Sequence, residues 1–180
     1  MLRKYKITGG RLVEVDDDSA EVFFYINPDE KENKYLIEQF YIDEHTLQSA
    51  LDPNELSRLE FEDNHTALIF KRPKNYSGKE QLLFKASTVA TFLFKDKLIV
   101  VGSEDIFLFE GKQFTKLESL IDVVLKLLSQ SINHFIEHLK VISMITDELE
   151  EKINKSMENK HLINLFALGK SLIYYLNAIE

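Results

Sequence analysis

Cysteine is absent from this chain of 180 residues, and its absence excludes several classes of protein. Without cysteine there is no disulfide framework, no thiolate metal site and no cysteine nucleophile. A glycine-rich phosphate-binding loop is also missing, and no serine stands in the G-x-S-x-G context of a nucleophile elbow. Basic residues are outnumbered, giving a formal net charge of −8. Nucleic acid is therefore disfavoured as a partner, because a phosphate backbone requires a basic patch.

Long hydrophobic runs are scarce as well. The first ten residues carry three basic side chains and lack the apolar core of a secretory signal. The most apolar window that we identify, residues 117–128, is interrupted by three charged residues and falls short of the roughly 20 apolar residues of a membrane-spanning helix. We therefore expect the chain, as given, to be soluble, and a reducing cytoplasmic location fits the lack of cysteine.

What the chain does contain is ordinary globular composition, with 44% hydrophobic and 29% charged residues. Aromatic and β-branched runs alternate with helical patterns over residues 1–114, which predicts an α/β domain. The segments that we expect to be strands are 2–7, 11–15, 21–26, 58–62, 65–71, 82–93 and 98–101, with 105–110 as a strand or a helical turn. The segments that we expect to be helices are 29–40 and 45–51.

Residues 115–180 are predicted to form a long helical hairpin. From Lys116 onward there is no proline, and Gly169 is the only glycine. Apolar residues recur there at heptad spacing, which predicts a helix over 117–157 with a buried seam. The seam comprises Ile121, Leu125, Leu128, Ile132, Phe135, Leu139, Ile142, Leu149 and Ile153.

A second seam predicts the returning helix, over 161–180, after a polar turn at 154–160. It comprises Leu162, Leu165, Phe166, Leu172, Ile173, Leu176 and Ile179. We expect the two seams to pack against each other. No capping glycine or proline ends the second helix. The sequence is therefore expected to be a fragment of a longer protein.

One motif in the first long helix has the form of a catalytic signature. His134-Phe-Ile-Glu-His138 spells H-x-x-E-H, the inverted zinc-peptidase pattern, with both histidines on one helix face. A zinc hydrolase also needs a third ligand, and no second motif supplies one. The favoured interpretation is a solvated or seam-flanking histidine pair, and a zinc hydrolase is the alternative.

Clustered acids offer weaker sites for a hard cation. One cluster comprises Asp147, Glu148, Glu150 and Glu151, whose oxygens could bind a cation loosely. The favoured interpretation is that these acids form a solvated helix tip. The run Asp16, Asp17 and Asp18 is better explained as a turn. Tyr174 and Tyr175 are expected to serve helix packing.

The segment from Gln39 to Asn64 resembles the CorA family of magnesium channels. The matching positions are Phe40, Ile42, Leu47, Leu51, Arg58, Glu60, Phe61, Glu62 and Asn64. Strand-like segments at 65–71, 89–94 and 98–101 follow in the family's order. The helix around Ile142, Ile145, Asp147, Glu148, Leu149 and Glu150 is also similar to that family.

The resemblance implies an α/β/α sandwich with a mixed sheet, followed by two branch helices. It also implies a stalk helix, two membrane helices and a Gly-Met-Asn pore loop, none of which stands in this sequence. In such a protein the chain would be a regulatory domain at the cytoplasmic face of a pentameric channel for Mg²⁺ or another divalent cation, with Co²⁺ or Zn²⁺ as alternatives. We expect this chain alone to be a monomer or weak dimer, unable to conduct ions.

The resemblance also implies where the cation-sensing acids should stand. The family's acidic pair matches Gln48 and Ser49, neither of which carries charge. A hard cation bound mostly by carboxylates would be held far more weakly there. Asp43, Glu44 and Asp52 are nearby candidate substitutes. A stand-alone interaction module, whose exposed seam docks on another helix, remains the alternative function.

Overall fold

The computed structural model describes residues 1–75, 82–105, 109, 114–156 and 158–179. Contacts between residues divide the chain into two compact units. Unit 1 comprises Met1–Phe70 and Ser87–Gln130, and unit 2 comprises Lys71–Ala86 and Ser131–Glu180. The domain boundary between residues 114 and 115 stays a prediction.

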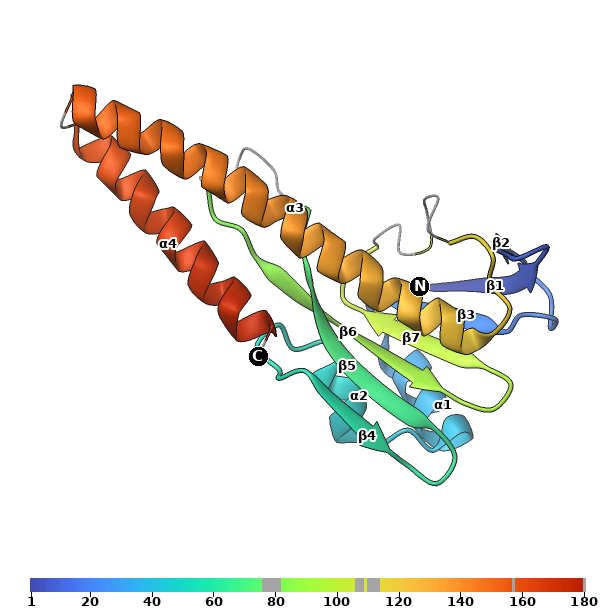
Figure 1. Cartoon of the computed structure of the whole chain (residues 1–180). Coiled ribbons are helices and arrows are strands. Elements are labelled where there is room, and N and C mark those ends of the chain that lie inside the picture. Colours follow the sequence, from blue (N-terminus) through green and yellow to red (C-terminus); the bar gives the residue numbers. More distant parts are fainter. Residues whose placement is uncertain (76–81, 106–108, 110–113, 157, 180) are drawn as a thin grey trace. The chain divides into compact units, whose positions relative to one another are not determined.

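The sheet of the first unit is mixed, as the sequence predicts (Figure 1). Its strands are β1 (Leu2–Thr8), β2 (Arg11–Glu14), β3 (Val22–Ile26), β4 (Arg58–Phe61), β5 (Thr66–Pro73), β6 (Ala86–Leu93) and β7 (Leu98–Gly102). Their order across the sheet is β2-β1-β3-β7-β6-β5-β4. The β3–β7 pair is parallel. The β1–β2, β1–β3, β4–β5 and β6–β7 pairs are antiparallel.

Helices cover both faces of this sheet, giving the predicted α/β/α sandwich. On one face lie α1 (Glu30–Phe40) and α2 (Glu44–Ser49), and the first turns of α3 (Leu120–Lys155) lie on the other (Figure 1). Alternate residues of each strand enter the two cores because successive side chains point to opposite faces. In β3, Phe24 packs with Val124 and Leu127 of α3. Its neighbour Tyr25 packs in the other core, with Leu36 of α1 and Leu47 of α2.

Side-chain caps fix where the two short helices begin. Asp29 caps α1 and forms a reciprocal capping box with Glu32. The helix ends at Tyr41, whose φ of 54° lies in the left-handed region. Two residues later Asp43 caps α2 by accepting a hydrogen bond from the Thr46 amide. Satisfying these otherwise unpaired amides sets the direction in which α2 leaves the loop.

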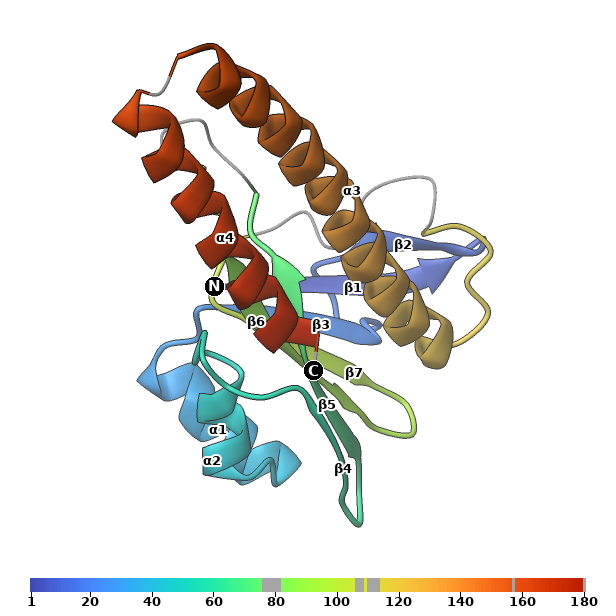
Figure 2. The same cartoon turned by 60° about the vertical axis from the view of Figure 1, so that its left-hand side comes forward.

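Unit 2 contains the part of the predicted hairpin from Ser131 onward, in which α4 (Asn159–Ile179) runs beside α3 (Figure 2). Its core comprises Phe84, Phe135, Ile142, Leu149, Leu168, Tyr175 and Ala178. Ser171 of α4 donates to the Leu82 carbonyl at 3.1 Å and accepts from the Phe84 amide at 2.9 Å. The segment before β6 is thereby held against α4.

The predicted seams were wrong about which helix faces are buried. In α4 all seven seam residues are exposed, by 37–75%, and the buried stripe is Leu168, Ser171, Tyr175 and Ala178. In α3 only Phe135, Ile142 and Leu149 of the seam are buried, whereas Ile121, Leu125, Ile132 and Leu139 are exposed. Both stripes of α4 have heptad spacing, so periodicity did not distinguish them. The buried one contains the polar groups that find partners inside unit 2.

The expectation about membrane spans also needs correction. One described helix, α4, has the length and composition of a membrane span, with a mean hydropathy of 1.3 over its most apolar window, of which 22% is buried. Most of this apolar character lies on the exposed stripe, which the sequence prediction had placed inside.

Element boundaries otherwise differ from the predicted ones by a few residues. The helix predicted at 117–157 is Leu120–Lys155, and that predicted at 161–180 is Asn159–Ile179. The β-rich segment predicted at 82–93 forms a strand only from Ala86, and Leu82 has a φ of 68°. Most of the segment predicted at 105–110 as a strand or a helical turn lies outside the described residues.

Candidate functional site

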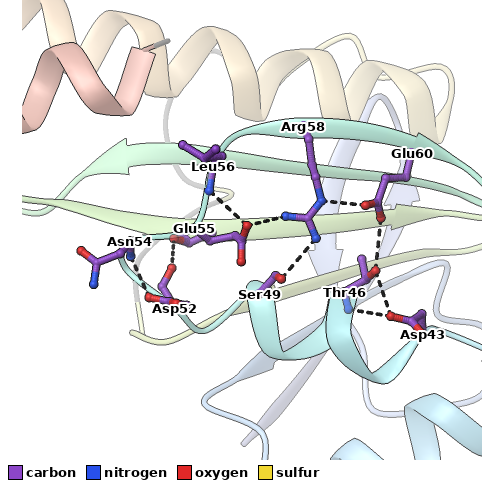
Figure 3. A network of polar contacts seen from close by, with 10 residues as sticks. Asp43, Thr46, Ser49, Asp52, Asn54, Glu55, Leu56, Arg58 and Glu60 are labelled. Carbon is purple, nitrogen blue, oxygen red and sulfur yellow. Dashed lines mark hydrogen bonds and ion pairs between the residues drawn. The ribbon is translucent and has the colours of Figure 1, made fainter.

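Arg58 is the centre of a polar network that joins α2 to the edge strand β4 (Figure 3). Its Nη1 donates to Glu55 Oε1 at 2.7 Å, and its Nε donates to Glu60 Oε1 at 2.6 Å. Its Nη2 reaches Ser49 Oγ at 3.2 Å. The other oxygen of Glu60 accepts from Thr46 Oγ1 at 3.2 Å. One guanidinium therefore holds two carboxylates and a hydroxyl in fixed positions.

The ionisation of these groups follows from their contacts. The hydrogen bond to Glu60 raises the pKa of Arg58. Hydrogen bonding to the Ser49 side chain lowers the pKa of Glu55, and Arg58 adds to the effect. The Thr46 amide lowers the pKa of Asp43. All three groups therefore stay charged near neutral pH.

Two of the candidate cation ligands already have backbone partners. Asp43 Oδ2 accepts from the Thr46 amide at 2.9 Å, as the cap of α2. Asp52 Oδ1 accepts from the Asn54 amide at 2.8 Å, closing the turn after α2. Both carboxylates serve local structure in the described chain.

The positions that match the family's acids lie on different sides of α2. Ser49 is buried, with 3% of its surface exposed, and faces Arg58. Gln48 is exposed, and its Nε2 donates to Glu44 Oε1 at 3.1 Å. Glu44 and Gln48 line a pocket of about 490 Å³ beside α1, to which Glu30, Asn33 and Glu38 also contribute. Of the candidate acids, Glu44 is the one that lines this pocket.

The acids in the second half of α3 are not brought together. Glu148 and Glu151 each pair with a lysine one turn later, at 3.7 Å and 3.4 Å. Asp147 and Glu150 are exposed. Nowhere in the described residues do three or more His, Asp or Glu side chains form a group that could hold a metal. The run at Asp16–Asp18 lies in a turn, where Asp17 accepts from the Ser19 amide at 2.9 Å.

The histidine pair lies at the contact between α3 and α4 rather than in solvent. His138 is buried, its Nδ1 is 2.5 Å from the Tyr175 hydroxyl, and its ring stacks on the Tyr175 ring. His134 lies next to it, with ring centroids 4.3 Å apart. Burial lowers the pKa of His134 to about 4, with further lowering by His138 and Arg72. Of the two forms of that prediction, the solvated pair was wrong, whereas the histidines do flank the buried seam residue Phe135, with His138 buried and His134 half-buried.

The sequence did not lead us to predict that Arg58 would bind Glu55, Glu60 and Ser49 at once. The spacing of Arg58 from Glu60 was a usable signal, because residues i and i+2 of a strand point to the same face. We also did not predict the contact of His138 with Tyr175, which joins residues 37 positions apart. No local pattern predicts that pairing.

A mixed sheet covered by helices, together with a helical hairpin, is the fold of two solved soluble domains. The soluble domain of CorA from Methanocaldococcus jannaschii has a TM-score of 0.78 and 17% identity, with 99% of this chain and 74% of that chain covered. The ZntB cytoplasmic domain from Vibrio parahaemolyticus has a TM-score of 0.67 and 14% identity, with coverages of 98% and 73%. At these identities the likeness shows the fold.

The family is established by sequence. The family described as CorA-like Mg²⁺ transporter protein matches residues 23–180, and the chain belongs to that family. It is a family of transporters and not of enzymes, so the zinc-hydrolase alternative falls. No curated protein matches the chain. The complete CorA magnesium transporter from M. jannaschii has a TM-score of 0.72 and 16% identity to this chain. The match covers 98% of this chain, which spans 58% of that protein's length.

Proposed function

We propose that this chain is the regulatory domain of a CorA-like divalent cation transport protein, at the cytoplasmic face of the membrane. In this role it senses a divalent cation, Mg²⁺ before Co²⁺ or Zn²⁺, and transmits occupancy to a pore that it does not itself form. Its partners are the transmembrane region of the full-length protein and the other subunits of a pentamer. By itself the chain is a monomer or weak dimer.

The observation that carries this proposal is the exposed apolar stripe of α4. Leu162, Leu165, Leu172, Leu176 and Ile179 stand at heptad spacing, with Gly169 at the intervening position, and all of these side chains face solvent. A stripe of this kind requires a helical partner. Relatives supply additional chain, since this one spans 58% of the full-length CorA and CmaX structures. A helix leading to the membrane is the proposed partner.

The cation site that we propose is the pocket between α1 and α2. Glu30, Glu38 and Glu44 supply carboxylates, and Asn33 Oδ1 is buried without a hydrogen-bond partner among the described residues. Mg²⁺ keeps several waters and uses one or two protein carboxylates. A hydrated ion of this kind does not need three converging ligands. Asp43, Asp52 and the acids of α3 are secondary candidates, since Asp43 caps α2, Asp52 closes the turn after it, and the acids of α3 are not brought together.

Cation binding is tested on the isolated chain by thermal unfolding with and without Mg²⁺, Co²⁺ or Zn²⁺. A ligand at about 100 times its Kd stabilises a protein by ~2.7 kcal/mol. Glu44→Gln should abolish the stabilisation, whereas Asp96→Asn, in the turn before β7, should keep it. If the cation stabilised both variants equally, its binding site would lie outside the pocket between α1 and α2.

The alternative function is a stand-alone interaction module. Reading the coding sequence beyond codon 180 distinguishes it from a regulatory domain. A regulatory domain requires a stalk helix, two apolar spans and Gly-Met-Asn in that sequence. A stop codon directly after Glu180, together with reversible self-association of the chain, would instead favour the module. Flux of Mg²⁺ through the full-length protein in liposomes, altered by Glu44→Gln, would support the regulatory role.

A further inference from the structure

A second pocket lies in unit 1, on the face of the sheet that α1 covers. Its volume is about 590 Å³, within the range of small-molecule sites. Leu2 of β1 and Phe23 and Tyr25 of β3 contribute to it from the sheet, where Leu2 pairs with Tyr25. Lys31 and Tyr35 contribute from α1. This pocket is separate from the one that holds Glu44.

We propose that this pocket binds a nucleoside phosphate, with the base against its aromatic side chains and the phosphates against its lysines. The inference is independent of the cation-sensing role, since none of the candidate cation ligands lines this pocket.

Three lysines give the pocket hydrogen-bond donors for an anion. Lys4, Lys31 and Lys97 line it, and no ion pair engages any of them in the described part of the chain. Lys4 stands opposite Phe23 in the β1–β3 pair, and Lys97 directly precedes β7. Three ammonium groups around one cavity suit the several charges of a phosphate chain.

The acids in the same lining are largely occupied. Glu32 Oε2 accepts from the Met1 amino group at 3.2 Å and from the Asp29 amide at 3.0 Å. Asp17 Oδ1 accepts from the Ser19 amide and hydroxyl, at 2.9 Å and 2.6 Å. Asp18 is the remaining acid. In formal charge the three acids balance the three lysines. Because two of the acids are held by hydrogen bonds to other groups, the lysine ammonium groups remain as the donors that a phosphate could reach.

The aromatic side chains give the pocket a place for a flat base. Tyr35 is 52% exposed, and its ring meets that of Phe40 edge to face with centroids 5.8 Å apart. Lys97 Nζ lies 5.7 Å from the centre of the Phe40 ring. An exposed ring beside cations is the combination that binds bases by stacking and phosphates by charge. Inorganic phosphate or a lipid headgroup would use only the lysines.

Calorimetric titration of the chain with ATP, adenosine and tripolyphosphate, in EDTA and without divalent cations, tests the inference. We expect ATP to bind one to one and more tightly than either fragment. Lys4→Gln, Lys97→Gln and Tyr35→Ala should each weaken ATP binding by about tenfold. Lys126→Gln, on α3 at the opposite face of the sheet, should leave it unchanged.

Two results would overturn the inference. One is no ATP binding at millimolar concentration by a chain that circular dichroism shows to be folded. The other is tripolyphosphate binding as tightly as ATP, which would mean a general anion site. Because Tyr35 is exposed, its substitution leaves the core intact and keeps the test free of misfolding. Since no divalent cation is present, failure here leaves the cation-sensing proposal standing.

Discussion

The Tyr175 hydroxyl and His138 Nδ1 lie 2.5 Å apart inside unit 2, joining α4 to α3. Tyr175 is 1% exposed, and Phe84 and Phe135 meet its ring edge to face. Burial raises the pKa of Tyr175, so its hydroxyl stays protonated and donates whenever the facing His138 nitrogen is unprotonated. The contact gives the hairpin a polar pairing that fixes the register of the two helices.

Removal of the Tyr175 hydroxyl should destabilise the hairpin. Tyr175→Phe keeps the ring but leaves a buried histidine nitrogen without its partner, at a cost of about 1–3 kcal/mol. Urea unfolding measures the difference. Tyr174→Phe, on the exposed neighbouring ring, is the matched control and should change stability by less than about 0.5 kcal/mol. Equal effects of the two substitutions would contradict a role for the buried hydroxyl.

The histidine pair should make the chain sensitive to acid. Burial lowers the pKa of His134 from 6.5 to about 4 and also lowers that of His138, an effect that Glu137 partly opposes. Between pH 6.5 and pH 4 the two histidines therefore bind protons more readily in the unfolded chain than in the folded chain. As a result, the free energy of unfolding falls as the pH falls. Below about pH 4 the loss from His134 levels off.

Substitution of His134 should reduce this pH dependence. Allowing for partial solvent screening, the loss that His134 contributes is about 1–2 kcal/mol. His134→Gln should flatten the curve of unfolding free energy against pH over this window, and His45→Gln, on the exposed surface of α2, should not. Both variants keep the same carboxylates, so the difference between the two curves is the quantity to compare. Parallel curves for the two variants would contradict a lowered pKa of His134 in the folded chain.

Sequence patterns predicted the sheet well because each strand carries its own signal. The aliphatic run Leu98–Val101 predicts a central strand, and β7 is buried along its whole length. Gly9 and Gly10 lie between the two predicted strands 2–7 and 11–15 and connect β1 to β2, and both have a positive φ, which glycine adopts without strain. The caps of α1 and α2, at Asp29 and Asp43, are likewise local interactions, which explains why both short helices were predicted close to their observed positions.

Local sequence patterns could not predict which face of α4 is buried in the hairpin. The stripe of α4 that contains Leu165 and Leu172 is the more apolar one, yet it is exposed. The stripe with Ser171 and Tyr175 is buried. That choice depends on partners distant in sequence, since Ser171 meets Leu82 and Phe84, and Tyr175 meets His138. The Arg58 network depends likewise on a fold that brings β4 to α2. The cation ligands stay a prediction.

Loss of the Arg58 guanidinium should loosen the contact of α2 with β4. Arg58→Ala leaves two carboxylates, each about one quarter exposed, without their shared cation. The expected loss of stability is about 1–2 kcal/mol, because the contacts are charged but only partly buried. Arg58→Lys should recover little of it, since an ammonium lacks the planar fork that reaches Glu55, Glu60 and Ser49 together.

The control for Arg58 is an exposed ion pair on a helix of the same unit. Lys34 lies 3.7 Å from Glu38 on α1, with both side chains more than half exposed. Lys34→Ala should therefore change stability by less than about 0.5 kcal/mol. Chemical denaturation of the three variants gives the comparison. A cost for Lys34→Ala equal to that of Arg58→Ala would mean that the network adds nothing beyond a surface pair.

The two stripes of α4 should respond oppositely to substitution. Leu172 is 45% exposed, so Leu172→Glu should leave the unfolding free energy nearly unchanged while removing self-association of the chain in sedimentation velocity runs. Leu168 is 1% exposed, so Leu168→Ala should cost about 2–4 kcal/mol through the cavity that it leaves, with no effect on association beyond that of unfolding. In the full-length protein Leu172→Glu should instead disrupt assembly, because the stripe that faces solvent here is the one proposed to meet a helical partner. Unfolding of the isolated chain by Leu172→Glu would place that stripe in the core, as its heptad spacing first indicates.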